Sequence, residues 1–389
     1  MHPVAERGGD TMAVDRSDPQ GVGGAKPVPD ALRRLRAAGQ SIWLDTISRE
    51  ILRSGELARL VRLGLGGVTS NPTIFEKAIA VGDAYPEVPG LLASGMDPEA
   101  VFEQVAVADI RDAADQLRPT FDARAGSDGF VSLEVSPRLA NDTAGTIAAA
   151  RRIWLAVDRP NLMIKIPATI AGIPAIADTV ANGINVNVTL LFNVERYIAV
   201  ANAYLDGLER FRQSGGDLAR ISTVASFFVS RVDTAVDGRL AGIPGTAHLI
   251  GKSAIANARI AYAHYRNIAS TPRWQALADH GARPMRLLWA STSVKNPALH
   301  PTYYVDALIG PDTVNTVPAP TLDAIFAGVD VARSIDAPGE IVQAETLLQE
   351  VMSHGIDLDA LTDRLELDGV ASFEASYTAI IEALTARRA

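Results

Sequence analysis

Eight short apolar segments recur along this chain, and patterns typical of helices separate them. Each segment is a nearly continuous apolar run, which is typical of strands that are buried on both faces. The segments are 41–46, 66–71, 130–135, 162–167, 185–191, 223–229, 286–291 and 313–317. Because parallel strands need helical crossovers, buried strands that alternate with helices predict an α/β protein with a parallel sheet.

The ends of these strands favour a closed sheet over an open one. A (β/α)8 TIM barrel takes about 250 residues, and up to about 400 with insertions, so the 389 residues of this chain are enough for one. An open doubly wound sheet is the alternative. Almost every predicted strand has a polar residue at or near its carboxyl end, where barrel enzymes collect their active-site groups. We therefore expect a (β/α)8 barrel.

The two ends of the chain differ from this repeating pattern. Residues 1–29 are rich in Gly, Pro, Asp and Ala and lack apolar periodicity, which predicts a mobile tail. Residues 30–389 are predicted to form a single catalytic barrel domain. After about residue 337, one apolar helical face runs from Ile341 to Val351 and another from Phe373 to Leu384. We expect these additional helices to pack on the barrel, over its mouth or at one of its ends.

One predicted strand has a lysine in its middle. Lys165 lies within the run NLMIKIPATIAG, residues 161–172, where apolar residues surround it. Lysine is rarely buried, and burial favours the neutral amine, which can attack a ketone or aldehyde and form a Schiff base. Alternatively, a lysine at a strand end extends its ammonium to solvent. The run alone leaves both interpretations open.

Polar side chains at the other strand ends provide the context for this lysine. The set is Asp45, Asn71, Glu134, Lys165, Asn187, Thr189, Ser226, Arg231, Ser291 and Lys295. Each has a structural alternative: Asp45 could cap the next helix, Asn71 could form a turn with Pro72, and Asn187 could satisfy backbone groups in a buried layer. A closed ring of strands would bring these ends together, and this favours a shared active site.

The chemistry of a lysine imine assigns a role to each carboxylate. Once a ketose is bound as the iminium, its C3–C4 bond can break if a base removes the C4 hydroxyl proton, and Asp45 is a suitable base. Formation and hydrolysis of the imine need a second proton carrier, which Glu134 with Thr189 could supply through an ordered water.

The remaining polar groups suit a phosphorylated sugar. Amide and hydroxyl groups would hold sugar hydroxyls, while Arg231 and the loop from Ser291 to Lys295 supply positive charge and donors for a phosphate. The predicted substrate-binding residues are Asn71, Asn187, Ser226, Phe228, Arg231, Ser291 and Lys295.

Five of these segments resemble those of transaldolases, in the expected order. The runs GVTSNPTIF at 67–75 and LMIKIPATIAGI at 162–173 are similar to the two characteristic motifs of that family. The runs SLEVSPRL at 132–139, NVNVTLLF at 185–192 and SFFVSR at 226–231 resemble further family segments. The resemblance covers nearly everything after the N-terminal tail.

The resemblance implies a (β/α)8 barrel with a Schiff base on Lys165. It implies Asp45 as the acid/base on the cleaved carbon chain, and Glu134 with Thr189 as the residues that position the catalytic water. The reaction it implies is reversible transfer of a dihydroxyacetone unit from fructose 6-phosphate or sedoheptulose 7-phosphate to glyceraldehyde 3-phosphate or erythrose 4-phosphate, in the non-oxidative pentose phosphate pathway. No cofactor or metal is expected, since the lysine is the electron sink.

One segment departs from the better-known branch of the family. There, an arginine that follows a serine after the seventh strand is the second phosphate ligand, whereas residues 290–297 here are ASTSVKNP. Ser291 and Lys295 are plausible replacements, as in the longer bacterial transaldolases, but lysine lacks the guanidinium fork.

Three other functions fit the sequence less well. Fructose 6-phosphate aldolases share the barrel and the lysine but lack the glutamate of the third strand, so Glu134 favours transfer over simple cleavage. A metal-dependent aldolase is disfavoured because the six histidines form no HxH or HExxH pair. A non-catalytic sugar-phosphate binder would need neither Lys165 nor two carboxylates.

Composition restricts the partners and the location. A net charge of −9 argues against nucleic acid and membrane as partners, so local basic groups must hold an anionic substrate. The absence of cysteine excludes disulfides and suits a reducing cytosol. We find no apolar run of roughly 18 residues and no secretory signal. We expect a cytoplasmic protein, either a monomer or a homodimer.

Overall fold

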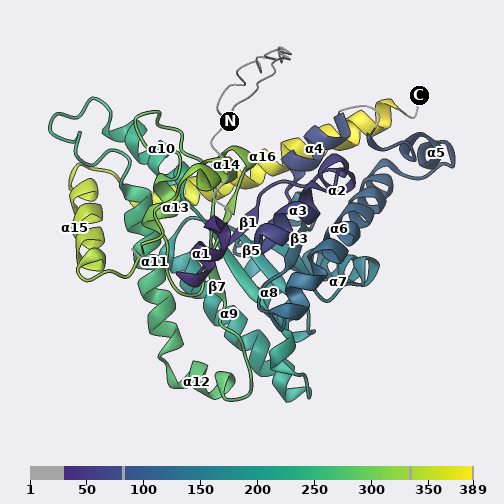
Figure 1. The fold of residues 1–389 in the computed structure, drawn as a ribbon, viewed down its shortest axis with the longest axis horizontal. Helices are drawn as coiled ribbons and strands as arrows, with labels where there is room; N and C mark the ends of the chain where they lie inside the picture. The colour runs from purple at the N-terminus through teal and green to yellow at the C-terminus, as the bar shows by residue number, and fades with distance from the viewer. Residues whose placement is uncertain (1–29, 81–83, 333–334, 388–389) are drawn as a thin grey trace, which may run out of the picture.

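A computed structural model shows a closed barrel of eight parallel strands with helices around it (Figure 1). The structure describes residues 30–80, 84–332 and 335–387, so the predicted mobile tail, 1–29, lies outside the described residues. The strands are β1 Gln40–Leu44, β2 Gly67–Thr69, β3 Phe130–Glu134, β4 Leu162–Pro167, β5 Val186–Leu191, β6 Thr223–Phe228, β7 Arg286–Ala290 and β8 Thr313–Val317. Each coincides with a predicted strand, and β1 pairs with β8. The predicted (β/α)8 barrel is therefore confirmed, and the open sheet is wrong.

Helices connect the strands along the chain, as parallel strands require. They are α1 Ala31–Ala37, α2 Arg49–Arg53, α3 Glu56–Leu63, α4 Pro72–Ala80, α5 Val88–Ala93, α6 Pro98–Ala123, α7 Thr143–Val157, α8 Gly172–Ala181, α9 Val194–Gln213, α10 Ser230–Leu240, α11 Ser253–Ala269, α12 Pro272–Ala278, α13 Tyr303–Ala307, α14 Ala319–Ala327, α15 Glu340–Ser353 and α16 Leu358–Ala386. Local sequence sets several starts: Asp97 and Asn193 cap α6 and α9 by accepting hydrogen bonds from backbone N–H groups of the first turn.

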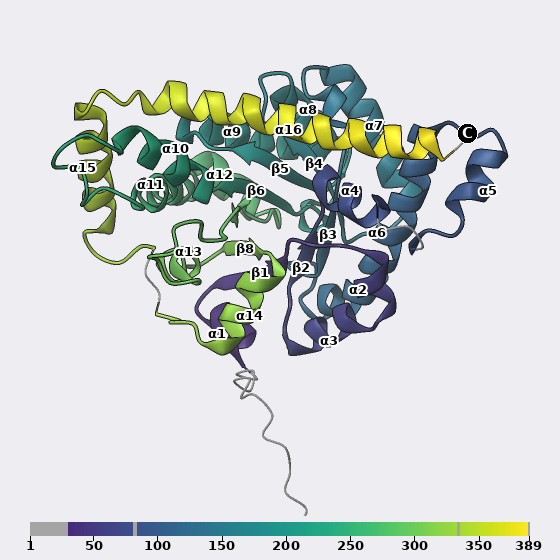
Figure 2. The same ribbon diagram turned by 90° about the horizontal axis from the view of Figure 1, so that it is seen from above.

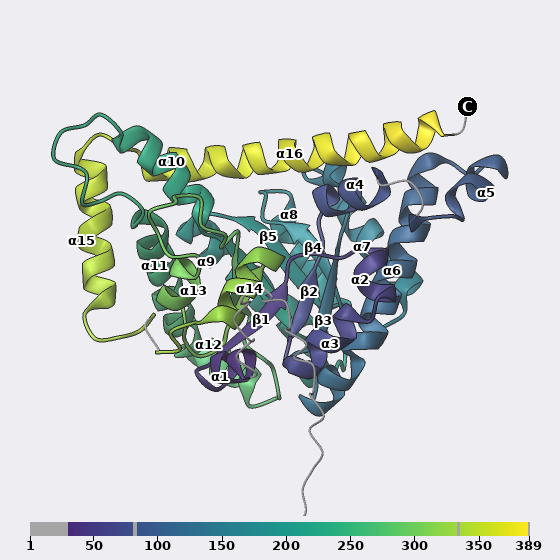
Figure 3. The ribbon, with the colours of Figure 1, turned by 45° about the horizontal axis from the view of Figure 1, so that its top comes forward.

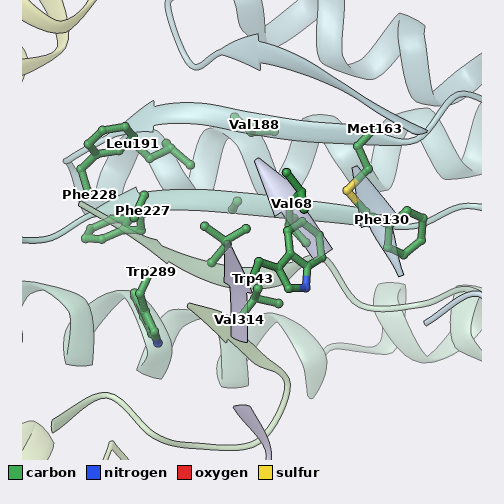
Figure 4. Close-up of a cluster of buried hydrophobic side chains, with 14 of the residues drawn as sticks. Trp43, Val68, Phe130, Met163, Val188, Leu191, Phe227, Phe228, Trp289 and Val314 are labelled. Carbon is green, nitrogen blue, oxygen red and sulfur yellow. The ribbon is translucent and has the colours of Figure 1, made fainter. Parts of the chain in front are cut away.

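Large apolar side chains fill the space in and around the barrel (Figure 4). Trp43, Phe130 and Trp289 are almost fully buried, and the ring of Phe121 meets that of Phe130 edge to face at 5.4 Å. The indole of Trp43 leaves no room for a side chain on β2, since a Cβ at Gly67 would lie 2.6 Å from the ring. This close packing holds the strands in position. The carboxyl ends of the same strands carry the polar residues of the predicted site.

The C-terminal helix α16 crosses the carboxyl end of the barrel. Figures 2 and 3 show it as one long yellow rod over the strands, and it contacts α4, α6, α10 and β5. A Cβ added at Gly369 would lie 2.8 Å from Leu190, so glycine allows the helix to approach the end of β5 closely. Further along, Ser376 and Thr73 share a hydrogen bond between their hydroxyls at 2.8 Å. The predicted packing of C-terminal helices on the barrel holds for α16, whereas α15 packs against helix α11.

A buried aspartate joins three of the outer helices, α10, α11 and α13. Asp233 on α10 accepts hydrogen bonds from the backbone N–H of Ala254 at 2.7 Å and from the Tyr304 hydroxyl at 2.8 Å. Burial outweighs these donors and raises the pKa of Asp233 to about 6.

The raised pKa predicts how stability depends on pH. The folded protein binds this proton more tightly than the unfolded chain, so the contribution is fully present below about pH 4 and is lost as the pH rises through about 6. The rise of the Asp233 pKa from its ordinary value, about 4, to about 6 corresponds to about 3 kcal/mol. We expect the free energy of unfolding of wild type, relative to Asp233→Asn, to fall by about this amount between pH 4 and pH 7. Urea titrations measure it, with the exposed Asp279→Asn as control; equal pH dependence in wild type and Asp233→Asn would contradict it.

Candidate active site

Strand register brings three predicted site residues to one level of the barrel. Glu134 on β3 is paired with Lys165 on β4, and Lys165 is paired with Asn187 on β5. Thr189 lies two residues beyond Asn187 on the same strand, so both side chains lie on the same face. The parallel sheet therefore collects these groups, which are far apart in sequence, at its carboxyl end.

Lys165 is buried at the carboxyl end of β4. Its side chain is 6% exposed, and its Nζ donates a hydrogen bond to the backbone carbonyl of Ser70 at 3.1 Å. The same Nζ lies 3.4 Å from Glu134 Oε2 and 5.7 Å from the centre of the Phe373 ring. The ammonium is therefore enclosed by a carboxylate, a carbonyl and an aromatic face and does not extend to solvent, so the surface alternative for this lysine is wrong.

Both predicted catalytic carboxylates have raised pKa values. Loss of solvent raises the pKa of Asp45, and the charge of Lys165 and a hydrogen bond from Thr69 Oγ1 at 2.8 Å oppose the rise. Burial likewise raises the pKa of Glu134, again opposed by Lys165. A carboxyl group whose pKa is raised toward neutral can both take up and release a proton during turnover, which acid/base catalysis requires.

Two buried oxygens among the predicted site residues lack a hydrogen-bond partner, although one of them is in the ion pair with Lys165. Thr189 Oγ1 and Glu134 Oε2 form no hydrogen bond with the residues that the structure describes, and Thr189 is fully buried. An unsatisfied buried polar atom costs free energy, so such atoms are usually met by ordered water or a ligand. Each of these two oxygens is therefore available to a water molecule or a ligand.

A chain of hydrogen bonds crosses the barrel at Asn187. Its Nδ2 donates to Ser132 Oγ at 2.9 Å, and its Oδ1 accepts from Ser226 Oγ at 2.7 Å. All three side chains are buried. These bonds fix the orientation of the Asn187 amide. The Ser226 hydroxyl donates its only proton to Asn187, and its oxygen can still accept a hydrogen bond from a substrate hydroxyl.

The remaining predicted substrate ligands lie around this centre. Asn71 Oδ1 accepts from the Ile74 N–H at 3.0 Å and so caps α4, which leaves its Nδ2 as a donor for a ligand. The Arg231 guanidinium lies 5.4 Å from the centre of the Phe228 ring. Burial lowers the pKa of Arg231, while the charge of Asp45 raises it, so this cation and this carboxylate act on each other.

The loop after β7 reaches the site with one of its two predicted residues. Ser291 has a left-handed backbone, with φ of 55°, and its hydroxyl hydrogen-bonds with that of Ser230 at 3.0 Å. Ser230 immediately precedes Arg231, so Ser291 lies beside the predicted phosphate ligand. Lys295 is exposed, and its Nζ donates to Ser293 within the same loop at 2.8 Å.

A cavity of about 520 Å³ opens next to the lysine, beside the ends of β2 and β3. Asn71 and Glu134 line it together with the rings of Phe75, Phe102 and Tyr377, but Lys165 does not. Glu134 therefore borders this cavity and also lies next to the amine.

Phe373 is one residue of the candidate site that sequence analysis did not identify. It was predicted to lie on the apolar face of a C-terminal helix, but nothing in that pattern shows which buried group the face covers. The ring faces the Lys165 ammonium from α16, which starts 193 residues after Lys165 in the chain. The backbone carbonyl of Ser70 was also missed, since any residue type supplies a carbonyl.

Replacing Phe373 tests whether its ring supports the reaction. A cation over an aromatic face gains about 0.5–2 kcal/mol, so we expect Phe373→Leu to lower kcat/KM about 2- to 30-fold while the thermal midpoint changes little. Leucine keeps the apolar bulk and removes the ring face. Tyr377→Phe, one turn further on the same helix, is the matched control. Unchanged kinetics in Phe373→Leu would show that the ring only packs.

The described residues do not indicate a metal centre or a membrane span. Among them, no cluster of three or more His, Cys, Asp or Glu side chains could hold a metal ion. Nor does any described helix have the length and apolar character needed to cross a bilayer.

Comparisons with known proteins agree with this geometry. The sequence profile of the transaldolase/fructose-6-phosphate aldolase family matches residues 42–384. Transaldolase from Acidothermus cellulolyticus is 52% identical over 359 residues, which cover 92% of this chain and 96% of that one. Transaldolase from Thermobifida fusca is 51% identical over 355 residues, 90% and 96% of the two chains. Transaldolase from Parafrankia sp. is 50% identical over 364 residues, 92% and 97%. The chain therefore belongs to the transaldolase/fructose-6-phosphate aldolase family.

Proposed function

We propose that this protein is a transaldolase in which Lys165 forms the Schiff base. The observation that carries the proposal is the enclosed amine: Lys165 Nζ lies 3.4 Å from a carboxylate at the carboxyl end of a closed barrel. Membership of the family supports the same reaction. The substrates are sedoheptulose 7-phosphate and glyceraldehyde 3-phosphate, which give erythrose 4-phosphate and fructose 6-phosphate in the non-oxidative pentose phosphate pathway.

The reaction begins and ends at the lysine. The Lys165 amine attacks the C2 carbonyl of the ketose phosphate, and the resulting carbinolamine loses water to give the iminium. Asp45 then removes the proton of the C4 hydroxyl, the C3–C4 bond breaks, and its electron pair moves toward the iminium nitrogen. The aldose phosphate leaves. The remaining three-carbon enamine attacks C1 of the acceptor aldose, whose oxygen takes the proton back from Asp45, and water releases the new ketose.

Glu134 and Thr189 are assigned to the water steps. Loss of water from the carbinolamine and its return at the end both need a proton carrier next to the nitrogen. Glu134 lies within ion-pair distance of Nζ, and its Oε2 and the Thr189 hydroxyl have no hydrogen-bond partner among the described residues. A water molecule between these two oxygens would hydrogen-bond with both. It would then attack the iminium carbon, C2 of the ketose, from a fixed direction.

The substrate phosphate is assigned to Arg231 with Ser291 and Lys295. In a chain with a net charge of −9, a local cation is needed to hold an anion. Ser291 meets the Arg231 segment through Ser230. Lys295 would have to leave Ser293 to reach the phosphate, and the flexible stem of lysine allows this. Asn71, Asn187, Ser226 and Phe228 complete the proposed substrate-binding set.

A coupled assay separates transfer from simple cleavage, the other activity named in the family description. With fructose 6-phosphate and erythrose 4-phosphate, we expect sedoheptulose 7-phosphate and glyceraldehyde 3-phosphate in equal amounts. With fructose 6-phosphate alone, little free dihydroxyacetone should accumulate. Steady release of dihydroxyacetone without an acceptor would identify an aldolase instead. Absence of both activities, with substrate bound, would favour a binding protein.

We also propose that the enzyme works in the cytoplasm as a monomer or a homodimer. A chain without cysteine suits a reducing compartment, and all the proposed site residues come from one chain. Light scattering after size exclusion gives the oligomeric state, and a protein of more than two subunits would contradict this proposal.

A further inference from the structure

A second polar cavity lies at the opposite end of the barrel from Lys165. It has a volume of about 390 Å³ and opens at the amino ends of the strands. Ser41 near the start of β1, Thr223 at the start of β6 and Arg286 at the start of β7 line it. No residue of the proposed catalytic set contributes to it.

Arginines dominate the charge of this cavity. Its charged lining residues are Arg36, Arg124, Arg283, Arg286, Asp128 and Asp312. Four cations against two carboxylates leave a net charge of about plus two, in a protein whose own net charge is −9. Such a local concentration of one sign attracts ions of the other.

The two carboxylates are occupied by neutral donors. Asp128, which is 4% exposed, accepts from Ser41 Oγ at 2.6 Å and from the indole N–H of Trp43 at 2.9 Å. Asp312 accepts from the Tyr265 hydroxyl at 3.0 Å. These bonds hold the aspartates to side chains of the fold rather than to the arginines.

Two of the arginines form only long ion pairs with Asp128, and the other two form none with the described acidic residues. Arg36 Nε lies 3.8 Å from Asp128, and the Arg286 guanidinium 3.9 Å, both too far for a hydrogen bond. Arg124 and Arg283 form no ion pair with the acidic residues that the structure describes, and Arg283 donates to the backbone carbonyl of Ala125.

Burial makes these cations more sensitive to an anion. The side chains of Arg36 and Arg286 are both 18% exposed, and Arg36 Nε is buried without a hydrogen-bond partner among the described residues. Burial lowers the pKa of Arg36; the charge of Asp128 opposes this, and the charges of Arg124 and Arg286 lower the pKa further. The mutual repulsion of these guanidinium groups would be relieved by a bound anion.

We propose that this cavity is a second anion site, which binds the phosphate group of a small phosphorylated metabolite. The planar guanidinium matches the oxygens of phosphate in pairs, and several arginines around one cavity suit a dianion better than a monovalent ion. The volume suffices for a small molecule. The hydroxyls of Ser127, Ser222 and Thr223 line the same space and can donate to the rest of the ligand.

Calorimetry with inorganic pyrophosphate tests the site on the full chain. The proposed catalytic site also contains a phosphate-binding residue, Arg231. The titration is therefore made with the Arg231→Ala variant, at constant ionic strength. We expect this variant to keep one binding event, and addition of Arg36→Gln with Arg283→Gln to weaken it about ten- to hundred-fold, the loss of one or two charge-assisted hydrogen bonds.

Matched variants keep the result interpretable. Arg34→Gln removes an exposed charge from the same helix α1, outside the cavity, and should leave binding unchanged. Thermal midpoints without anion establish that each variant folds, and pyrophosphate should raise the midpoint of Arg231→Ala but not of the variant that also lacks Arg36 and Arg283. Two results would show that the second site does not exist. In the first, Arg286→Gln and the Arg36→Gln, Arg283→Gln pair leave the affinity of the Arg231→Ala variant for pyrophosphate unchanged. In the second, Arg231→Ala alone abolishes all binding. Neither result bears on the transfer reaction.

Discussion

Lys165→Ala is expected to abolish transfer. In the proposed mechanism the reaction runs through a covalent bond to Nζ, and removal of a covalent nucleophile costs about 10⁵- to 10⁶-fold in kcat. Incubation of wild type with fructose 6-phosphate, followed by borohydride reduction and peptide mapping, should give a three-carbon adduct on the peptide that contains Lys165. Erythrose 4-phosphate added before reduction should discharge the adduct. The variant should give none.

The same variant has a structural consequence that must be separated from the chemistry. The charge of Lys165 lowers the pKa of Glu134, and without it burial acts unopposed, so this carboxyl group should bind its proton more tightly. Lys165→Met, which fills the space with apolar atoms, should therefore fold and bind fructose 6-phosphate without forming an adduct. Lys252→Ala, at an exposed position, is the control for the lysine content. An adduct that persists on another lysine in Lys165→Ala would show that the wrong amine was assigned.

The strand positions were predictable because strands that are buried on both faces are nearly continuous apolar runs in the sequence. The β4 segment was predicted as 162–167 and is Leu162–Pro167, and the predicted 313–317 is β8. Once the strands close into a barrel, geometry alone places Lys165 beside Glu134. This is why a list of strand-end residues contains so much of the site.

Contacts made by the last helix were not predictable in the same way. The apolar face that includes Phe373 repeats with helical spacing, and this spacing indicates burial without indicating the partner. Whether α16 crosses the catalytic end or the other end depends on the path of the chain after β8. Phe373 and Gly369 take their roles from that path, the first over Lys165 and the second against Leu190.

The second cavity escaped prediction for a related reason. Arg36, Arg124 and Arg286 are far apart in the sequence, and each resembles an ordinary surface charge when taken alone. Barrel enzymes collect their active-site groups at the carboxyl ends of the strands, so the strand-end pattern predicts nothing about the amino ends. Only the closed barrel shows that the residues before β3 and at the start of β7 share one space.

Asp45→Asn is expected to stop carbon–carbon cleavage while sparing the imine. Loss of a general base costs about 10²- to 10⁴-fold, so kcat should fall by that factor. The borohydride adduct with fructose 6-phosphate should still form on Lys165, now with all six carbons because the C3–C4 bond stays intact. Mass analysis of the reduced peptide distinguishes six carbons from three. A three-carbon adduct formed at the wild-type rate would show that another group removes the proton.

The pH profile gives Asp45 a second and independent test. The base must be ionised, and loss of solvent raises its pKa, so kcat/KM in wild type should fall with decreasing pH at a value above that of an ordinary aspartate, about 4. Thr69 Oγ1 donates to Asp45 and lowers that pKa, so Thr69→Val should move this acid limb to still higher pH because the charged form loses a donor. Ser94→Ala, at an exposed position on the surface, should leave the limb in place. A limb that Thr69→Val does not move belongs to another group, and Glu134, whose pKa burial also raises, would then be the residue to vary.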